Sequence, residues 1–336
     1  MPRNKKKVAI ILPSSMIISG LTSGVTRQAL GYKSALELAG INAEFISFRN
    51  NINEYSHALL IQHTPEIKLL IERIRTKNPK IKLAYLPIYD PDKPTSLLKK
   101  ILYTIPTEKI AFINSPRLMR WACDHVDEIW VRSEWERNAI LNTRTLSDIN
   151  IVPLSLPFEI PIDFKRIKKD IDYLFVGHIN DPRKNLVNLI KAISQIDAHL
   201  YIAGVGNMEL IVSKLGNTSL KNFTYLGYLK DIELHSIYKR TKVICLPSYF
   251  EGVGLSAMEA NAFGAIPAIT SIGGAKDYFE DQAIYIDDPK SIIQISSRLR
   301  DALARSKKFG EKNTLFLNKY SIEALSQLFK KMKFFE

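Results

Sequence analysis

The chain has 336 residues, of which 46% are hydrophobic and 24% charged, values that exclude a disordered or low-complexity protein and are typical of globular domains. This length exceeds one ordinary hydrophobic core, so we expect two domains. Two cysteines far apart in sequence, Cys123 and Cys245, indicate a reducing compartment. No apolar run approaches the ~20 residues that a membrane-spanning helix needs.

The net charge of +13 is unevenly distributed along the chain. Residues 1–109 carry 17 Lys and Arg against 8 Asp and Glu, and residues 305–336 carry 8 against 3. A basic surface of this kind can bind nucleic acid or an anionic membrane, or it can serve solubility alone. No motif that reads nucleic acid accompanies the charge, so the sequence does not favour a nucleic-acid partner.

The first half of the chain alternates strand-like and helix-like segments, which predicts βαβ units and a parallel sheet. Strands are expected at 8–12, 43–48, 57–63, 82–89, 109–114 and 128–133, and helices at 24–39, 65–77, near Ser96 and at 116–124. The basic start followed by an apolar run also looks like a signal peptide. Pro13 interrupts that run, and a first buried strand from Val8 to Leu12 is the favoured interpretation.

A proline-rich stretch from Ile151 to Pro157 predicts an interdomain connection. The same alternation then resumes, with strands expected at 172–179, 198–206, 223–229, 243–248, 265–271 and 283–287, a helix at 185–196 and a helical tail at 314–333. We therefore expect one doubly wound α/β domain over residues 1–155, a second over 156–312, and a C-terminal helix over 313–336.

The most informative segment is 247–267, PSYFEGVGLSAMEANAFGAIP, which places Glu251 and Glu259 eight positions apart. Gly252 and Gly254 permit a tight turn, so we expect a loop that becomes a helix near Ser256 and ends at a C-cap glycine at 264. Backbone N–H groups at the start of a helix lack intrahelical partners and bind anions. This combination suits a ligand that has both a phosphate and sugar hydroxyls.

The segment resembles the E-x7-E signature of retaining glycosyltransferases of family four, within the pattern PS-x-x-EG-x-GL-x-x-x-EA-x-A-x-G-x-P. The resemblance is strong over residues 170–290 and looser before them. It implies the GT-B fold: two Rossmann-like domains that face each other across a cleft, with a C-terminal helix that crosses back to the first domain. It also implies metal-independent transfer, without a cofactor, from a nucleotide-diphosphate sugar such as a UDP- or GDP-sugar to a glycan, lipid-linked or protein-linked acceptor.

The resemblance also implies roles for individual residues of the signature. Glu251 would orient the hydroxyls of the donor sugar, and Glu259 would accept hydrogen bonds from the ribose. Backbone amides would contact the donor phosphates from the loop and helix start formed by Gly252, Val253, Gly254 and Leu255. No covalent nucleophile is assigned.

A second motif, from Gly177 to Asn185, follows an expected strand and opens a helix, and it contains Arg183 and Lys184. Basic side chains are disfavoured at a helix start, so a bound anion explains them better than solvation does. Arg provides a two-pronged donor and Lys a compact charge, both suited to a leaving phosphate. In the resembled family this turn holds the donor pyrophosphate, and the pair counts here as catalytic together with Glu251. The family often has Arg where His178 stands.

Other loops gain a role only through the resemblance. Gly24 would face the donor phosphates from the first domain, and the loops containing Gly204, Gly227 and Leu229 would border the nucleobase. Tyr89 and Asp90 occupy roughly the place at which the family offers a histidine toward the donor sugar, so they are the acceptor-side candidates.

Two alternatives stay open. The chain could bind a nucleotide sugar, a polyanion or nucleic acid without catalysis, through its basic first domain. The segment 65–82 is basic and amphipathic, which suits either an anionic membrane surface or an ordinary helix that covers its sheet. We expect a cytoplasmic enzyme that associates peripherally with a membrane.

Overall fold

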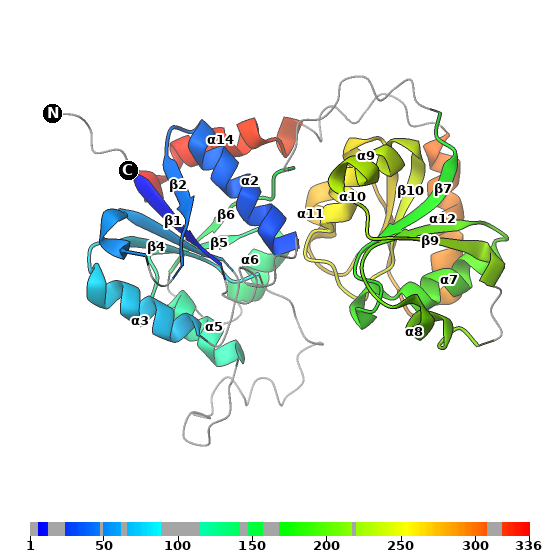
Figure 1. Ribbon diagram of the computed structural model, residues 1–336, viewed down its shortest axis with the longest axis horizontal. Coiled ribbons are helices and arrows are strands. Elements are labelled where there is room, and N and C mark those ends of the chain that lie inside the picture. Colours follow the sequence, from blue (N-terminus) through cyan, green and yellow to red (C-terminus); the bar gives the residue numbers. More distant parts are fainter. Residues whose placement is uncertain are drawn as a thin grey trace, which may run out of the picture. The chain divides into compact units, whose positions relative to one another are not determined.

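The computed structural model describes residues 6–12, 24–47, 50–61, 66–88, 115–141, 147–156, 168–216, 220–307 and 318–336. The chain forms two compact units, one of residues Met1–Pro157 with Tyr320–Glu336 and one of residues Phe158–Lys319 (Figure 1). The expected helix near Ser96 and the expected strand at 109–114 lie outside the described residues.

The first unit contains a six-stranded sheet in the order β2-β1-β3-β4-β5-β6. Every pair of neighbouring strands is parallel, as the alternation in the sequence predicts. The strands are β1 (Lys7–Ile11), β2 (Asn42–Phe45), β3 (His57–Ile61), β4 (Lys82–Leu86), β5 (Glu128–Val131) and β6 (Asp148–Ile151).

Helices cover both faces of this sheet, and the alternation of side chains along β1 shows why. Val8 and Ile10 contribute to the core on one face, while Ala9 and Ile11 contribute to the core on the other. The covering elements are α2 (Gly24–Leu38) and α14 (Ile322–Lys331) on the first face, α3 (Ile67–Lys77) and α5 (Ser115–Cys123) on the second, with η1 (Ile52–Glu54) and α6 (Glu134–Leu141) beside them.

The C-terminal segment completes the first unit, which confirms the expected return of the last helix. Helix α14 packs against α2, although the two are separated by the whole second unit in sequence (Figure 1). The ring of Trp130 in β5 stacks on Phe329 of α14 at a centroid distance of 5.6 Å. After α14, the turn η6 (Lys333–Phe335) brings the carbonyl oxygen of Phe334 to 2.8 Å from Nε2 of the buried His57.

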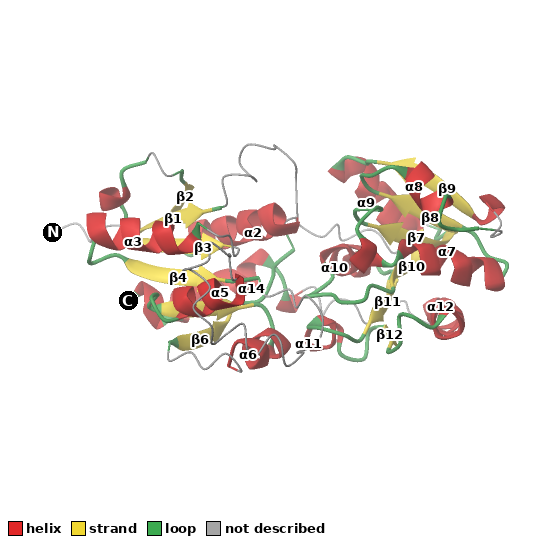
Figure 2. Ribbon diagram, turned by 90° about the horizontal axis from the view of Figure 1, so that it is seen from below, coloured by secondary structure: helices red, strands yellow, loops and turns green. Residues whose placement is uncertain are grey.

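The second unit contains another parallel six-stranded sheet, in the order β12-β11-β10-β7-β8-β9, and in Figure 2 its strands run between helices. Helices α7 and α12 pack together on one face, and α10 lies with α9 on the other. The strands are β7 (Ile171–Val176), β8 (Leu200–Ala203), β9 (Phe223–Gly227), β10 (Thr241–Leu246), β11 (Ile266–Thr270) and β12 (Ile284–Ile286). The helices and turns are η4 (Pro182–Lys184), α7 (Leu186–Gln195), α8 (Met208–Val212), η5 (Leu220–Asn222), α9 (Asp231–Arg240), α10 (Leu255–Ala262), α11 (Ala275–Phe279) and α12 (Ile292–Ser306).

One feature of the second sheet locates the candidate site. Strands β7 and β10 are neighbours, and the chain proceeds outward from them in opposite directions, through β8 and β9 on one side and β11 and β12 on the other. In open α/β sheets, ligands bind at the carboxyl ends of the strands at such a reversal. The two loops that leave β7 and β10 are the Gly177–Asn185 turn and the start of the 247–267 segment.

Candidate functional site

The loop after β7 forms a compact turn that displays two basic side chains. Asp181 caps the short turn η4, since its Oδ1 accepts a hydrogen bond of 2.9 Å from the backbone N–H of Arg183. Proline follows the cap, which suits the first position of a helical turn. Arg183 and Lys184 therefore lie in a separate turn ahead of α7, and the helix itself begins at Leu186.

Asn185 joins this turn to its surroundings. It adopts the left-handed conformation, with φ 57° and ψ 32°, which asparagine tolerates better than most residues. Its buried side-chain Nδ2 donates to the carbonyl oxygens of Pro247 at 2.9 Å and Pro289 at 2.6 Å. The orientation of Lys184 is thus fixed by the next residue, Asn185, whose backbone is left-handed and whose side chain is hydrogen-bonded to two other loops.

The loop after β10 is held at Glu251 by backbone contacts with the loop after β11. The N–H of Glu251 donates to Ile272, its carbonyl oxygen accepts from Gly274, and Glu251 forms an isolated parallel bridge with Gly273. A Cβ atom on Gly273 would lie 2.0 Å from the carbonyl oxygen of Glu251, so only glycine permits this approach.

Helix α10 begins and ends as the signature predicts, within one residue. Gly254, with φ 86°, is its N-cap, and the helix starts at Leu255, where the sequence predicts a start near Ser256. At the other end Gly264, with φ 79°, donates to Asn261, and the N–H of Ala265 donates to Ala260, which forms a Schellman motif.

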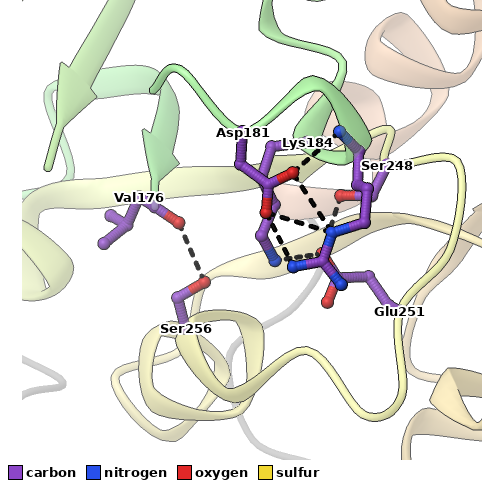
Figure 3. A network of polar contacts seen from close by, with 7 residues as sticks. Val176, Asp181, Lys184, Ser248, Glu251 and Ser256 are labelled. Atoms are coloured by element: carbon purple, nitrogen blue, oxygen red, sulfur yellow. Dashed lines mark hydrogen bonds and ion pairs between the residues drawn. The ribbon is translucent and has the colours of Figure 1, made fainter. Parts of the chain in front are cut away.

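The two loops meet through Lys184 and Glu251, which Figure 3 shows from close by. The Nζ of Lys184 lies 2.7 Å from Oε1 of Glu251, and the hydroxyl of Ser248 donates to the same oxygen at 2.6 Å. Glu251 is 6% exposed and Ser248 is fully buried, so this carboxylate is largely removed from water. The sequence predicts separate contacts of Lys184 and Glu251 with a ligand, and the structure shows that they also pair with each other.

Arg183 points its guanidinium to Asp181 rather than to Glu251. Its Nε lies 3.1 and 3.2 Å from the two carboxylate oxygens of Asp181, and its Nη2 lies 2.8 Å from Oδ2. The Arg183 side chain is 52% exposed, whereas that of Asp181 is 18% exposed. An exposed pair of this kind contributes little to stability, so the guanidinium can turn to a bound anion at small cost.

The start of α10 presents two backbone amides toward the same edge of the sheet. The backbone N–H groups of Leu255 and Ser256, the first two residues of the helix, have no hydrogen-bond partner within the described ranges. The hydroxyl of Ser256 donates to the carbonyl oxygen of Val176 at 3.1 Å and so fixes the helix start beside the end of β7 (Figure 3). These amides therefore lie at the same edge of the sheet as Lys184.

Glu259 lies one turn inside α10, and it is 2% exposed. Its Oε2 accepts a hydrogen bond of 3.0 Å from the hydroxyl of Tyr238, which is in α9 and is fully buried. The second carboxylate of the signature is thus fixed by a residue that the sequence motif does not include.

The glycines expected near the nucleobase lie side by side at the carboxyl ends of β8 and β9. A Cβ atom on Gly204 would lie 1.8 Å from the carbonyl oxygen of Gly177, and the Gly204 N–H donates to Gly227 at 2.8 Å. The exposed Tyr228 and the half-buried Leu229 follow Gly227. These loops therefore adjoin the Gly177–Asn185 turn, whatever their ligand.

The remaining expected site residues, Gly24, Tyr89 and Asp90, belong to the first unit. Gly24 is the first, exposed residue of α2 in the first unit, and the acceptor-side candidates Tyr89 and Asp90 lie outside the described residues.

Over the described ranges, no three His, Cys, Asp or Glu side chains are grouped as metal ligands, and no helix has the length and hydropathy of a membrane span. Burial raises the pKa of the Cys123 thiol to about 12 and that of Cys245 still further.

Four residues of this site have no specific role assigned from sequence: Asp181, Asn185, Tyr238 and Ser248. An Asp-Pro pair before a helix is a recognisable N-cap signal and could have identified Asp181. Ser248 is the serine of the PS-x-x-EG pattern, but its hydrogen bond to Glu251 depends on the path of the loop after β10, which the pattern does not show. For Tyr238 the sequence contains no such signal, because its partner is fixed only by the packing of α9 on α10.

The fold places the chain in a known class. Sucrose-phosphate synthase from Thermosynechococcus elongatus superposes with a TM-score of 0.70 at 15% identity, covering 96% of this chain and 97% of that one. Together with the two parallel sheets and the returning C-terminal helix, this likeness shows the GT-B fold, as the sequence predicts.

Residues 159–316 of the chain match the family described as glycosyl transferases group 1. An uncharacterized glycosyltransferase of Methanocaldococcus jannaschii is 30% identical over 155 residues, which cover 41% of this chain and 39% of that protein. A GalNAc-alpha-(1->4)-GalNAc-alpha-(1->3)-diNAcBac-PP-undecaprenol alpha-1,4-N-acetyl-D-galactosaminyltransferase of Campylobacter jejuni is 30% identical over 137 residues, 38% of this chain and 37% of that protein. The chain thus matches less than half the length of these relatives.

Proposed function

We propose that the protein is a retaining glycosyltransferase that transfers a sugar from a nucleotide-diphosphate sugar to an acceptor hydroxyl. The observation that carries this proposal is the contact of Lys184 with Glu251 at 2.7 Å, at the reversal of strand order. The first two amides of α10, which have no partner in the described part of the chain, lie at the same edge of the sheet. A cation, a carboxylate and helix-start amides at one place suit a ligand with adjoining phosphate and sugar groups. The match of residues 159–316 to the glycosyl transferases group 1 family supports the same chemistry.

In the proposed reaction the bond between the anomeric carbon and the β-phosphate oxygen breaks. The acceptor oxygen forms its bond on the same face of the sugar, and the acceptor proton goes to the leaving phosphate. Lys184 and Arg183 stabilise the charge that develops on that phosphate, together with the amides from Gly252 to Leu255. Glu251 orients the sugar hydroxyls, and Glu259 accepts from the ribose.

Titration of the protein with UDP, GDP, ADP and their sugar conjugates, with EDTA present, tests this proposal. We expect saturable binding of one nucleotide and slow hydrolysis of its sugar conjugate in the absence of acceptor. Lys184→Ala should lower turnover about 100-fold or more, by the size of a lost oxyanion donor. Binding without any turnover would favour the non-catalytic alternative.

A matched control lies at the opposite ends of the same two strands. Lys242 of β10 pairs with Asp172 of β7 at 2.6 Å, an ion pair of similar length near the amino ends of these strands. Lys242→Ala should leave turnover unchanged. Equal losses in Lys184→Ala and Lys242→Ala would show that Lys184 acts on stability alone.

For the acceptor, we propose a lipid-linked molecule at an anionic membrane surface. The outer face of α3 exposes Leu69 (69%) beside Lys68, whose Nζ lies 5.3 Å from the ring centroid of Trp121. Basic residues with an exposed apolar side chain suit such a surface. The name of the Campylobacter relative, which includes PP-undecaprenol, supports this class of acceptor.

Flotation with phosphatidylglycerol vesicles and with phosphatidylcholine vesicles tests the membrane part of the proposal. We expect binding to the anionic vesicles, weakened in Leu69→Glu. Ile232→Glu is the control, because Ile232 is 86% exposed but lies on α9 in the second unit. Absence of binding to either vesicle removes the membrane surface from the proposal and leaves the donor chemistry in place.

A further inference from the structure

The two carboxylate oxygens of Glu251 have different surroundings. Oε1 accepts from both Lys184, at 2.7 Å, and Ser248, at 2.6 Å (Figure 3). Oε2 has no hydrogen-bond partner among the residues that the structure describes. The carboxylate is therefore held through one oxygen, and the other oxygen is available for a ligand.

The position of the Ser248 hydroxyl is fixed by the backbone on both sides of it. The preceding carbonyl, of Pro247, accepts from Nδ2 of Asn185 at 2.9 Å. The following N–H, of Tyr249, donates to the carbonyl oxygen of Arg183 at 2.8 Å. The loop that contains Ser248 is thus bonded to the turn that contains Lys184, independently of the serine side chain.

Lys184 has two possible anionic partners in the proposed reaction, Glu251 and the donor diphosphate. If Lys184 shifts its hydrogen bonds to the diphosphate, Glu251 loses its only paired cation among the described residues while remaining 6% exposed. A nearly buried carboxylate without a hydrogen-bond donor is strongly disfavoured. The hydroxyl of Ser248 stays in place and prevents that state.

We propose that Ser248 is a positioning residue: its hydroxyl holds Oε1 of Glu251 while Lys184 engages the donor diphosphate, so that Oε2 stays directed to the sugar hydroxyls. This inference rests on the proposed function. The observed side-chain contact of Ser248 is with Glu251. Its effect passes through Glu251 and belongs to the sugar part of the donor.

A double-mutant cycle tests the inference, with Ser248→Ala, Glu251→Ala and the combined variant assayed on the donor that the wild-type protein uses. Ser248→Ala should lower kcat about 10-fold or more, the usual effect of a lost hydrogen bond to a charged group. Affinity for the nucleoside diphosphate alone should stay within about twofold, because that ligand lacks the transferred sugar that Glu251 is proposed to orient. In the Glu251→Ala background, removal of the hydroxyl should change kcat by less than about twofold.

Ser296→Ala is the matched control, since Ser296 is buried in the same unit and its hydroxyl donates to Ala192 of α7 at 3.1 Å, away from the site. It should lower the Tm without changing kcat. If Ser248→Ala does not fold, Ser248→Cys keeps the volume with a weak donor, and the cycle is measured with it.

Two results overturn the role of Ser248 and leave the proposed function standing. One is full kcat in Ser248→Ala, and the other is an equal loss of kcat with and without Glu251. A wild-type protein that neither binds nor turns over any nucleotide sugar removes the proposed function, and this inference with it.

Discussion

Tyr238 donates its hydroxyl proton to Oε2 of Glu259 at 3.0 Å, and it thereby joins α9 to α10 inside the core of the second unit. Both side chains are almost completely buried. The phenol hydroxyl therefore fixes the orientation of the carboxylate that we propose as the acceptor of hydrogen bonds from the ribose. Such a bond to a charged group is worth about 1.5–3 kcal/mol.

Tyr238→Phe should weaken binding of the nucleoside diphosphate about 10-fold, because Glu259 loses a donor that fixes its orientation. Calorimetric titration measures the change. Tyr173→Phe is the control, since its buried hydroxyl donates to Leu299 at 3.2 Å on the opposite face of the sheet. A similar loss of affinity in both variants contradicts a specific role for Tyr238.

Asn185 combines a left-handed backbone with two side-chain hydrogen bonds, and two substitutions separate these contributions. Asn185→Gly keeps the conformation and loses the bonds, whereas Asn185→Ala loses both. We expect the alanine variant to unfold with a free energy about 1 kcal/mol lower than the glycine variant. Urea unfolding followed by circular dichroism measures this difference. Tryptophan fluorescence would not report on the second unit, because all three tryptophans lie in the first unit. Equal stabilities mean that the backbone at Asn185 carries no strain.

Gly273 permits the close contact with Glu251, and alanine there should be severely destabilising. With φ 115° and a Cβ only 2.0 Å from a backbone oxygen, Gly273→Ala should cost about 3 kcal/mol or more and displace Glu251. Gly216→Ala has a positive φ of 60° but open space around it, so it should cost only about 1 kcal/mol. Thermal unfolding and turnover of the two variants distinguish steric displacement from backbone strain.

The buried amine of Lys169 should make the unfolding free energy depend on pH. Its Nζ donates to the carbonyl oxygens of Thr241, at 2.6 Å, and of Phe263, the C-cap of α10, at 2.9 Å, and burial lowers its pKa to about 8. Between pH 8 and the unfolded pKa near 10.5 the unfolded chain binds more protons, so the contribution of Lys169 to the unfolding free energy rises with pH.

The difference in unfolding free energy between the wild type and Lys169→Met isolates this group from other titrating side chains. That difference should shift in favour of the wild type as the pH increases from 8 to 10. Urea unfolding at several pH values measures it. A difference that does not vary with pH shows that the Lys169 amine titrates as in the unfolded chain.

The central strands of both sheets were predictable because they are buried on both faces and appear as continuous apolar runs, as in β3 and β10. Strand β6 was not predicted. It lies at an edge of the first sheet, and its four residues Asp148–Ile151, in which polar side chains alternate with isoleucine, are exposed or half-buried. Helix α12 was also missed, although Ser291 followed by Gln294 is a recognisable cap signal.

It was easier to predict which residues belong to the site than which of their side chains pair with each other. The resemblance to the glycosyltransferase family implied that Arg183, Lys184 and Glu251 act together, and both loops do leave adjacent strands. It could not show that Lys184 pairs with Glu251 while Arg183 pairs with Asp181. Such choices depend on distances of a few ångströms between segments 67 residues apart in sequence.

The return of α14 also sets the order in which the protein can fold during synthesis. Phe329 and Phe334, which pack against Trp130, are translated after the entire second unit. While the ribosome extends the chain, the second unit can fold as soon as it emerges, whereas the face of α2 and Trp130 stays uncovered. A chain that stops short of residue 320 therefore retains the whole family signature, yet exposes apolar surface in the unit that was made first.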